Sequence, residues 1–350
     1  MTNSAPRSPY RGLPRRAFWK SVADRGEGPA DDLYRPRFEI TRKTAIFTAG
    51  SCFAQHIGQS LRRAGCRIVD TEAMPDMVPE TVARRFGYRQ YSARYGNIYT
   101  PRQLRQLLGE IDGTLTPAYP VWVRDGRFFD ALRPAVEPEG LETPDLVAEH
   151  RRLHLARARS AFARGEVFVF TLGLTEAWIH RESGTVYPTA PGTIAGAHDP
   201  EVFAFHNFSF AEVIEDLHAI RAQLQARQPG MRMVLTVSPV ALTATASDAH
   251  VEVATSYSKA VLRAAAGQMM SECADVDYFP SYEIVTSRAA RGRYLSADLR
   301  DVTPAAVEDV MQIFFAAHGI ERGDPADHAT TLDDLDAPVC EDLLLEAFGR

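Results

Sequence analysis

Cysteine is scarce in this sequence, and its few cysteines lie far apart. No two of the four form a Cys-x-x-Cys pair, so neither a zinc ribbon nor a dithiol redox site is expected. The four are Cys52, Cys66, Cys273 and Cys340. So few thiols in 350 residues are typical of a reducing compartment. A chain of this length buries a full core without disulfides or structural metals, and we expect neither a metal nor a cofactor.

Long apolar runs and an excess of positive charge are missing as well. No stretch approaches the roughly 18 consecutive apolar residues of a membrane helix. The arginines near the N-terminus are not followed by the apolar run, about 7–15 residues long, of a secretory signal. The 39 basic and 45 acidic residues give a net charge of −6, which argues against a general affinity for nucleic acid or anionic membranes. We therefore expect a cytoplasmic protein without a membrane span.

The apolar pattern divides the chain into an arm, one domain and an extension. Residues 1–40 are rich in Pro, Arg and Gly, which predicts an arm that drapes over the domain or is partly disordered. Residues 41–320 alternate apolar runs with helical patterns, and residues 321–350 form a C-terminal extension. Strands are predicted at residues 44–50, 67–70, 166–172, 232–238 and 275–279. Helices are predicted at residues 55–64, 101–109, 144–164, 210–228, 251–270 and 304–318. This alternation indicates an α/β fold whose parallel sheet has helices on both faces.

Insertions near residues 110–145 and 181–209 interrupt the alternation. Residues 121–129 predict a hairpin, because Asp125 and Gly126 supply a two-residue turn with positive φ. Residues 181–209 contain several glycines and prolines without a clear period, which predicts a long irregular loop. We expect both segments to roof the edge of the sheet and to exclude water from a site there.

Ligands of open parallel sheets bind beyond the carboxyl ends of the strands. Ser51 stands at such an end, where the first predicted strand turns into a helix, and two interpretations are open. A serine at this position is a favoured helix N-cap. It can also be a nucleophile, because the N–H groups and dipole of the helix favour a developing oxyanion. The neighbouring Cys52 is expected to face the core as a small apolar side chain.

Several motifs carry a resemblance to a known family. The string Gly-Ser-Cys-Phe-Ala at residues 50–54 resembles the signature of the GSCFA-domain family of bacterial proteins. Further blocks lie at residues 95–100, 173–178, 236–240, 258–259 and 278–283, so the resemblance spans residues 45 to about 315. The GSCFA family is similar to the SGNH (GDSL-like) hydrolases. This similarity implies a flavodoxin-like three-layer sandwich with a central, mostly parallel sheet.

The resemblance also implies roles for single residues. Ser51 falls on the SGNH nucleophile, whose own N–H helps to hold the oxyanion. Gly96 and Asn97 resemble the second SGNH block, in which a glycine N–H donates to the oxyanion. Residues 173–176 resemble the third block, and Thr175 stands where SGNH enzymes have an asparagine amide. A hydroxyl donates only one hydrogen bond, so Asn97 is the alternative donor.

The last block departs from the SGNH pattern. SGNH enzymes have Asp-x-x-His before the final helix, whereas this chain has Asp298-Leu-Arg-Asp301, so Asp301 takes the place of the histidine. The best-placed imidazole is then that of His250, with Asp298 or Asp301 as its orienting partner. The alternative bases are His198, His206 and Glu176. For Glu176 this requires burial to raise the pKa of its carboxyl.

Two functions follow from these residues. The first is a serine hydrolase or O-acyltransferase acting on an ester, with a carbohydrate ester as one candidate. Ser51 would attack the acyl carbonyl and His250 would accept its proton. The N–H groups of Ser51 and Gly96, with Asn97 or Thr175, would hold the oxyanion. The second is a non-catalytic binding module that keeps the SGNH-type pocket. Either function implies a small molecule or a glycan as the partner.

Overall fold

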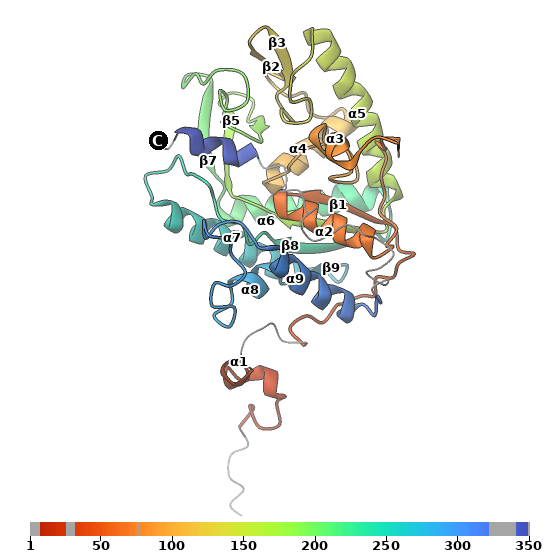
Figure 1. Ribbon diagram of the computed structural model, residues 1–350, viewed down its shortest axis with the longest axis vertical. Coiled ribbons are helices and arrows are strands. Elements are labelled where there is room, and N and C mark those ends of the chain that lie inside the picture. The colour runs from red at the N-terminus through yellow and green to blue at the C-terminus, as the bar shows by residue number, and fades with distance from the viewer. Residues whose placement is uncertain (1–7, 26–31, 76, 322–340, 349–350) are drawn as a thin grey trace, which may run out of the picture.

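A parallel sheet forms the centre of the molecule. The computed structural model describes residues 8–25, 32–75, 77–321 and 341–348, and its main sheet has the order β1-β4-β8-β9 (Figure 1). The strands are β1 (Ile46–Gly50), β4 (Val167–Leu172), β8 (Arg232–Val237) and β9 (Val276–Tyr278). They are almost entirely buried, as expected for parallel strands covered on both faces. Four of the five predicted strands are thus confirmed, whereas residues 67–70 contribute only one bridge, from Ile68 to Ile46.

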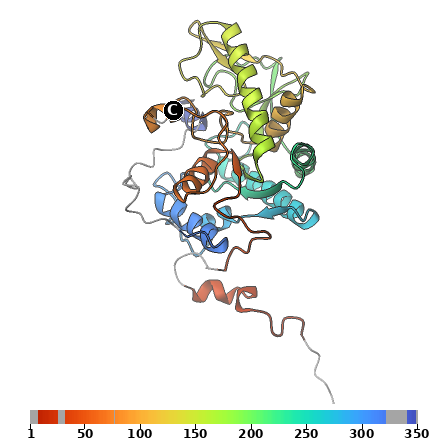
Figure 2. The same cartoon turned by 90° about the vertical axis from the view of Figure 1, so that its right-hand side faces the viewer.

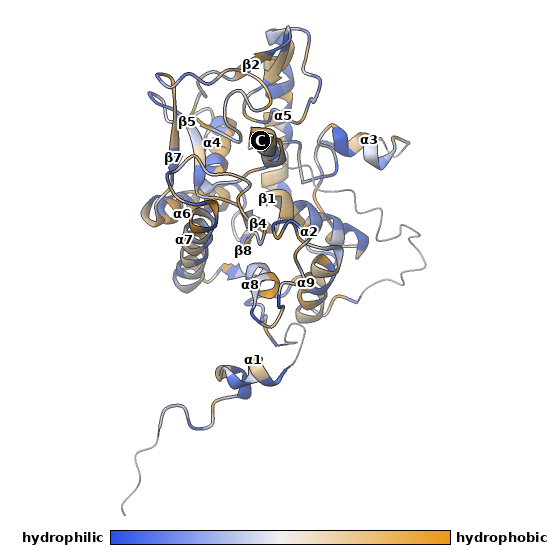
Figure 3. Cartoon of the chain, turned by 60° about the vertical axis from the view of Figure 1, so that its left-hand side comes forward, coloured by the Kyte–Doolittle hydropathy of each residue, from blue (hydrophilic) through white to orange (hydrophobic). Residues whose placement is uncertain are grey.

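Helices flank the sheet on both faces (Figures 1 and 2). One face packs against α4 (Pro101–Asp112), α5 (Pro144–Arg164), α6 (Phe210–Arg227) and α7 (Val251–Glu272). The other packs against α2 (Cys52–Arg63), α8 (Ser281–Thr286) and α9 (Pro304–Ala317). Successive residues of a strand point to opposite faces, so Phe168 and Phe170 enter the first core and Val167 and Val169 the second. Much of the outer surface of the helices is hydrophilic (Figure 3). The predicted helices are confirmed, although α2 begins three residues earlier than expected, at Cys52.

A smaller antiparallel sheet stands beside the main one. It has the order β6-β5-β7 and consists of β5 (Glu176–His180), β6 (Val186–Tyr187) and β7 (Phe203–Asn207). The prediction that residues 181–209 are wholly irregular is therefore wrong, because two short strands in this segment pair with β5. Strand β5, which was not predicted, follows β4 along the chain.

The predicted hairpin is confirmed, but its position differs from the expectation. It is formed by β2 (Val121–Arg124) and β3 (Arg127–Asp130), and Asp125 and Gly126 have φ values of 51° and 73°. Trp122 and Phe129 share a small core with Tyr187 and Phe203. The hairpin therefore supports the smaller sheet and does not roof the main one.

The second half of the predicted arm packs against the core of α2, α8 and α9. Tyr34 and Ile40 are buried there. The Tyr34 hydroxyl and the backbone N–H of Arg37 each donate to the carboxylate of Asp277 at 2.9 Å, and Asp277 is fully buried on β9. The arm thus supplies hydrogen-bond donors to a buried carboxylate of the main sheet.

The remaining elements are short. They are η1 (Arg15–Ala17), α1 (Lys20–Asp24), α3 (Glu80–Arg85) and η4 (Glu341–Phe348). Figure 1 shows α1 apart from the α/β body. We call η4 the C-terminal turn. None of the helices in the described part of the chain is long and apolar enough to cross a membrane.

We predict that Gly165→Ala destabilises the protein by about 1–3 kcal/mol, the usual range for overpacking a core. A Cβ at this position would lie 2.0 Å from Cδ1 of Phe47, and the Phe47 ring is held by stacking on Phe168 with ring centroids 4.4 Å apart. Urea unfolding measures the effect. The control is Gly58→Ala in α2, where a Cβ would have its nearest neighbours at 3.5 Å and the higher helix propensity of alanine favours stability. Equal stability of the two variants would contradict the packing argument.

Candidate active site at the carboxyl edge of the sheet

Three chain segments are joined by backbone hydrogen bonds where β1 and β4 end. The N–H of Ser51 donates to the carbonyl of Thr171 at 3.2 Å, and the N–H of Ile98 donates to the carbonyl of Gly50 at 2.9 Å. The N–H groups of Gly173 and Leu174 both donate to the carbonyl of Tyr99 at 3.0 Å. The motif blocks at residues 50–54, 95–100 and 173–178 therefore meet at one place, beyond the carboxyl ends of two neighbouring strands.

Glycine at position 173 allows this close approach. A Cβ on Gly173 would lie 2.8 Å from the Cβ of Ser51 and 3.1 Å from the carbonyl oxygen of Tyr99. Real Cβ atoms do not tolerate the shorter of these contacts. The third block thus packs its backbone directly against the side chain of Ser51.

The Ser51 side chain does not cap the helix that it begins. Ser51 is the N-cap residue of α2, yet its side chain makes no capping hydrogen bond. It is 4 % exposed, and its Oγ is buried with no hydrogen-bond partner among the described residues. An unpartnered buried hydroxyl costs about 1–3 kcal/mol. Helix capping therefore does not explain the serine.

The Asn97 side chain is held in one orientation. Its Oδ1 accepts a hydrogen bond from Nε2 of Gln55 at 3.1 Å and a short one from the Tyr91 hydroxyl. The Tyr91 hydroxyl also lies 3.1 Å from the carbonyl oxygen of Ser51. Because two donors fix the oxygen of the amide, its NH₂ group must point the other way. That group donates to the carboxylate of Glu341.

Tyr99 joins Asn97 as a second donor to the same carboxylate oxygen. The Tyr99 hydroxyl lies 2.7 Å from Oε2 of Glu341, the oxygen that also accepts from Asn97. Residues two apart in an extended segment point to the same side, which brings both donors together. Glu341 belongs to the C-terminal turn and is 3 % exposed. Burial raises the pKa of its carboxyl, although the hydrogen bonds from Asn97 and Tyr99 act in the opposite direction.

Thr175 and Gly96 have structural roles at the same edge. The Thr175 hydroxyl donates to Oδ1 of Asn207 at 2.7 Å, and its N–H donates to Oγ of Ser258 at 2.9 Å. The single proton of that hydroxyl is therefore used within the protein. Gly96 has a φ of 70°, which turns the chain immediately before Asn97. The N–H of Ser51 is likewise used, in its bond to Thr171.

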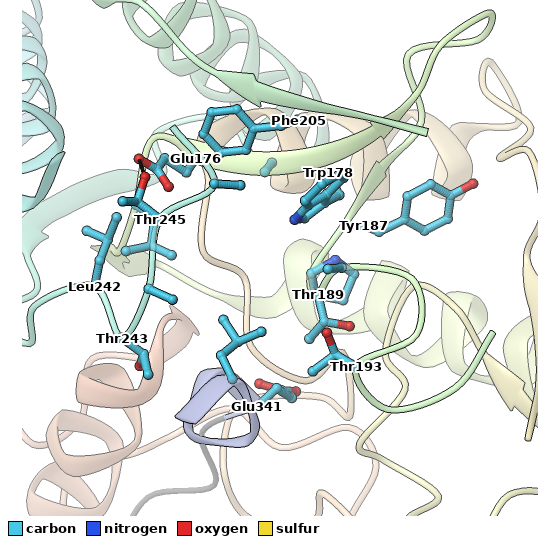
Figure 4. Close-up of a pocket in the computed structure, with 17 residues that line it drawn as sticks. Glu176, Trp178, Tyr187, Thr189, Thr193, Phe205, Leu242, Thr243, Thr245 and Glu341 are labelled. Carbon is cyan, nitrogen blue, oxygen red and sulfur yellow. Dashed lines mark hydrogen bonds between the residues drawn. The ribbon is translucent and has the colours of Figure 1, made fainter. Parts of the chain in front are cut away.

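A pocket of about 180 Å³ opens beside this cluster (Figure 4). Its wall includes the aromatic side chains of Trp178, Tyr187 and Phe205 and the two carboxyl groups of Glu176 and Glu341. Threonine hydroxyls and parts of residues 187–193 and 242–246 complete it. Residues of the predicted loop thus line the pocket, as does the C-terminal turn.

Glu176 is the buried acid on the side of the pocket opposite Glu341 (Figure 4). It is 9 % exposed and accepts a hydrogen bond from the Thr245 hydroxyl at 2.8 Å. Burial raises the pKa of its carboxyl, and the bond from Thr245 opposes the rise only in part. Glu176 begins strand β5, so it is not an acid in the first turn of a helix.

Within the described residues, none of His250, Asp298 and Asp301 is hydrogen-bonded to Oγ of Ser51. His250 is the N-cap of α7, where its Nδ1 accepts from the N–H of Glu252 at 3.3 Å, and its side chain is 70 % exposed. Asp298 accepts two backbone N–H groups of its own turn, and Asp301 pairs with Arg300 at 2.7 Å. These three side chains stabilise a helix start and a surface turn.

Several other histidines contact residues away from Ser51 or are buried in an uncharged form. His206 pairs with Glu212 at 2.8 Å, and the His198 ring meets Trp178 edge to face. Burial lowers the pKa values of His56, His154 and His318 to about 4, with nearby arginines adding to the effect. Within the described residues, no imidazole is hydrogen-bonded to Oγ of Ser51.

Four site residues were missed by sequence reasoning. Tyr99 stands inside the block at residues 95–100, and its spacing of two from Asn97 was an available signal. Tyr91 and Gln55 orient the Asn97 amide, and nothing in their local sequence indicates this role. Glu341 lies 244 residues from Asn97 along the chain, so no local pattern connects the two.

Comparison with known proteins matches most of the chain to one family. A model described as the GSCFA family matches residues 45–314. The matched span contains Ser51, Asn97, Tyr99 and Glu176, whereas the C-terminal turn lies beyond it. No curated protein matches the chain.

We predict that Ser51→Ala leaves the free energy of unfolding unchanged or raises it by up to about 1 kcal/mol, because the variant removes a buried hydroxyl without a partner. The control is Ser209→Ala. Ser209 caps α6 in a complete capping box with Glu212, and the loss of such a cap costs about 1 kcal/mol. Chemical denaturation of both variants checks this. A loss in Ser51→Ala as large as that in Ser209→Ala would show that Ser51 has a structural role after all.

Proposed function

This chain belongs to the GSCFA family, and we propose that it is an SGNH-type serine hydrolase or O-acyltransferase that acts on an ester. The observation that carries the proposal is the state of the Ser51 hydroxyl. It stands at a helix N-terminus, where positive dipole and N–H groups favour negative charge, yet it neither caps the helix nor bonds to another group. A nucleophilic role accounts for a serine that the fold keeps without a structural task.

The strand order supports an SGNH-type, flavodoxin-like sheet. The bridge at Ile68 adds a short fifth strand beside β1. If the five strands are numbered by their order along the chain, their order across the sheet is 2-1-3-4-5. In sheets of this order the ligand binds where the order reverses, which here is between β1 and β4. Ser51 follows β1 and Gly173 follows β4, so both lie at that point.

The oriented Asn97 amide is the proposed oxyanion donor. Catalysis by such donors depends on their being fixed before the reaction, so that no reorganisation is needed as charge develops. Gln55 and Tyr91 provide this fixation by holding the amide oxygen. Asn97 therefore takes the role that the resemblance gives to Thr175, since the Thr175 proton is given to Asn207.

The reaction follows from these placements. Oγ of Ser51 attacks the acyl carbon, its proton passes to a base, and the carbonyl oxygen becomes an oxyanion bound by Asn97. The ester C–O bond then breaks, the alcohol leaves with a proton, and the acyl group remains on Ser51. Water or an acceptor hydroxyl then takes the acyl group. We propose Glu176 as the base, directly or through one water, because it is a buried carboxyl three residues beyond Gly173, which packs against the Ser51 side chain, and because burial raises its pKa.

The pocket supports a carbohydrate as the alcohol part of the ester. Sugars present an apolar ring face and hydroxyl edges, and the pocket combines aromatic side chains with threonine hydroxyls. Fixed polar groups in an otherwise apolar wall are typical of sites that orient a small molecule. Its partial cover by residues 187–193 and by the C-terminal turn favours transfer to a bound acceptor over hydrolysis.

A non-catalytic binding module is the second candidate. The observation in its favour is that no imidazole contacts Oγ of Ser51 among the described residues. Such a module would bind the same ester or its product and leave it unchanged. Covalent labelling of Ser51 separates the two functions.

We predict that a fluorophosphonate labels the protein once, at Ser51, as measured by intact mass and peptide mapping. Ser51→Ala abolishes the labelling, whereas Ser209→Ala, which removes a serine used only as a helix cap, labels at the normal rate. Asn97→Ala slows labelling by about 10²–10³-fold, the usual effect of losing one oxyanion donor. If the folded wild-type protein takes up no label, the binding module becomes the better description.

A second pair of variants identifies the base. We predict that Glu176→Gln lowers turnover of an ester substrate by at least about 10²-fold, as expected for a lost general base. His250→Ala is expected to change turnover less than about threefold and to cost about 1 kcal/mol of stability, because the structure uses His250 as a helix cap. The activity of Glu176→Gln is measured against pH, together with the thermal unfolding of both variants. If His250→Ala lost turnover and Glu176→Gln kept it, His250 would be the base.

A further inference from the structure

We propose that Asn97 and Tyr99 form a carboxyl-binding subsite beside Ser51, and that the C-terminal turn fills it with Glu341 as an internal ligand. The subsite takes one oxygen of a carboxyl group or of an ester carbonyl. In this state the site is closed, and a substrate enters only when Glu341 leaves.

The convergence of two donors on one oxygen carries the first part of the proposal. The Asn97 amide and the Tyr99 hydroxyl come from one extended segment and both donate to Oε2 of Glu341. All three residues are at least 97 % buried, with exposed fractions of 2 %, 3 % and 3 %. A contact this deep, with the amide already oriented by Gln55 and Tyr91, has the geometry of a binding site and differs from a surface contact between exposed side chains.

The position of the oxygen carries the second part. If Asn97 is the oxyanion donor, a carboxylate oxygen already bound to it occupies the place of the substrate carbonyl. The turn also adds Leu345 to the wall of the pocket. It therefore fills space in the pocket in addition to accepting the hydrogen bond of the Asn97 amide. With the turn in place, Oγ of Ser51 is buried.

The chemistry of the subsite favours a weakly charged oxygen. Burial raises the pKa of the Glu341 carboxyl despite its two hydrogen bonds, so the site compensates the cost of burying a full negative charge only in part. A neutral ester carbonyl carries no such cost in the ground state and gains from the donors as negative charge develops. The subsite is therefore suited to exchange Glu341 for an ester.

The part of the proposal that concerns Ser51 rests on the proposed function, whereas the docking of Glu341 does not. The test therefore uses a readout that needs no catalysis. Cys52 follows Ser51, is 4 % exposed, and has its Sγ 3.9 Å from the Tyr99 hydroxyl. Cys66 is 7 % exposed and lies beyond the other end of α2, a helix of 12 residues that is about 18 Å long. Release of the turn should expose the first thiol and not the second.

The experiment measures the rates at which iodoacetamide alkylates Cys52 and Cys66 in the full-length chain. We expect Glu341→Ala to raise the Cys52 rate by about tenfold or more, Glu341→Gln to raise it less, and neither to change the Cys66 rate. The matched control is Leu344→Ala in the same turn, since Leu344 is 48 % exposed and should leave both rates unchanged. Sodium acetate should slow the alkylation of Cys52 in Glu341→Ala by filling the vacated subsite, and sodium chloride at equal ionic strength should not.

Three results would overturn the proposal. An unchanged Cys52 rate in both Glu341 variants would mean that the turn does not close the site. A joint rise of the Cys52 and Cys66 rates in both variants would mean that Glu341 acts on the stability of the whole chain. A rise at Cys52 that acetate does not reverse would mean that no carboxyl-binding subsite exists. Fluorophosphonate labelling, measured in parallel, decides the role of Ser51 separately, because its absence leaves the thiol rates informative.

Discussion

The contact between Gly173 and Ser51 is the constraint on which the site depends. It brings the backbone that follows β4 against the side chain that follows β1, at a distance that no Cβ on residue 173 would allow. The carbonyl of Tyr99 accepts two N–H groups from the same stretch after β4, so the segment carrying Asn97 and Tyr99 is fixed by the same contact. Backbone hydrogen bonds thus position Ser51 and the segment that carries Asn97 and Tyr99, and the side chains of Gln55 and Tyr91 then orient the Asn97 amide. Under the proposed function, this support holds the reacting groups within the narrow range of positions that catalysis requires.

The features with strong local signals could be predicted from the sequence. Short continuous apolar runs such as residues 166–172 favour a strand buried on both faces, and the Asp125-Gly126 pair between two apolar stretches favours a tight hairpin. The rule that ligands lie at the carboxyl ends of strands also predicts that Ser51 and residues 173–176 share one edge of the sheet. These features follow from backbone geometry and from burial, and both leave a signal within a short stretch of sequence.

The sequence leaves a choice open where one residue type has two uses. Serine and histidine can each cap a helix or take part in catalysis; His250 was predicted to be a base, whereas both uses stayed open for Ser51. In the structure His250 caps α7 and Ser51 caps nothing. Local sequence cannot separate these uses, because they differ only in the tertiary surroundings of the side chain. The pairing of Glu341 with Asn97 and Tyr99 is a stronger case, since it joins segments that share no pattern and are far apart along the chain.

The contacts of Asp277 bear on where this domain begins as a unit of folding. The family match starts at residue 45, but Tyr34 and Arg37 supply two of the hydrogen-bond donors to this fully buried carboxylate. A fragment trimmed to the matched span would keep the main sheet with Ser51, Asn97 and Tyr99, yet it would leave the buried carboxylate of Asp277 short of hydrogen-bond donors. Hydrogen bonds to charged groups contribute about 1.5–3 kcal/mol each, which is a large share of the stability of a typical domain. The folding unit therefore begins earlier than the family match at residue 45, because it includes the donors to Asp277. An expressed fragment should begin before Tyr34.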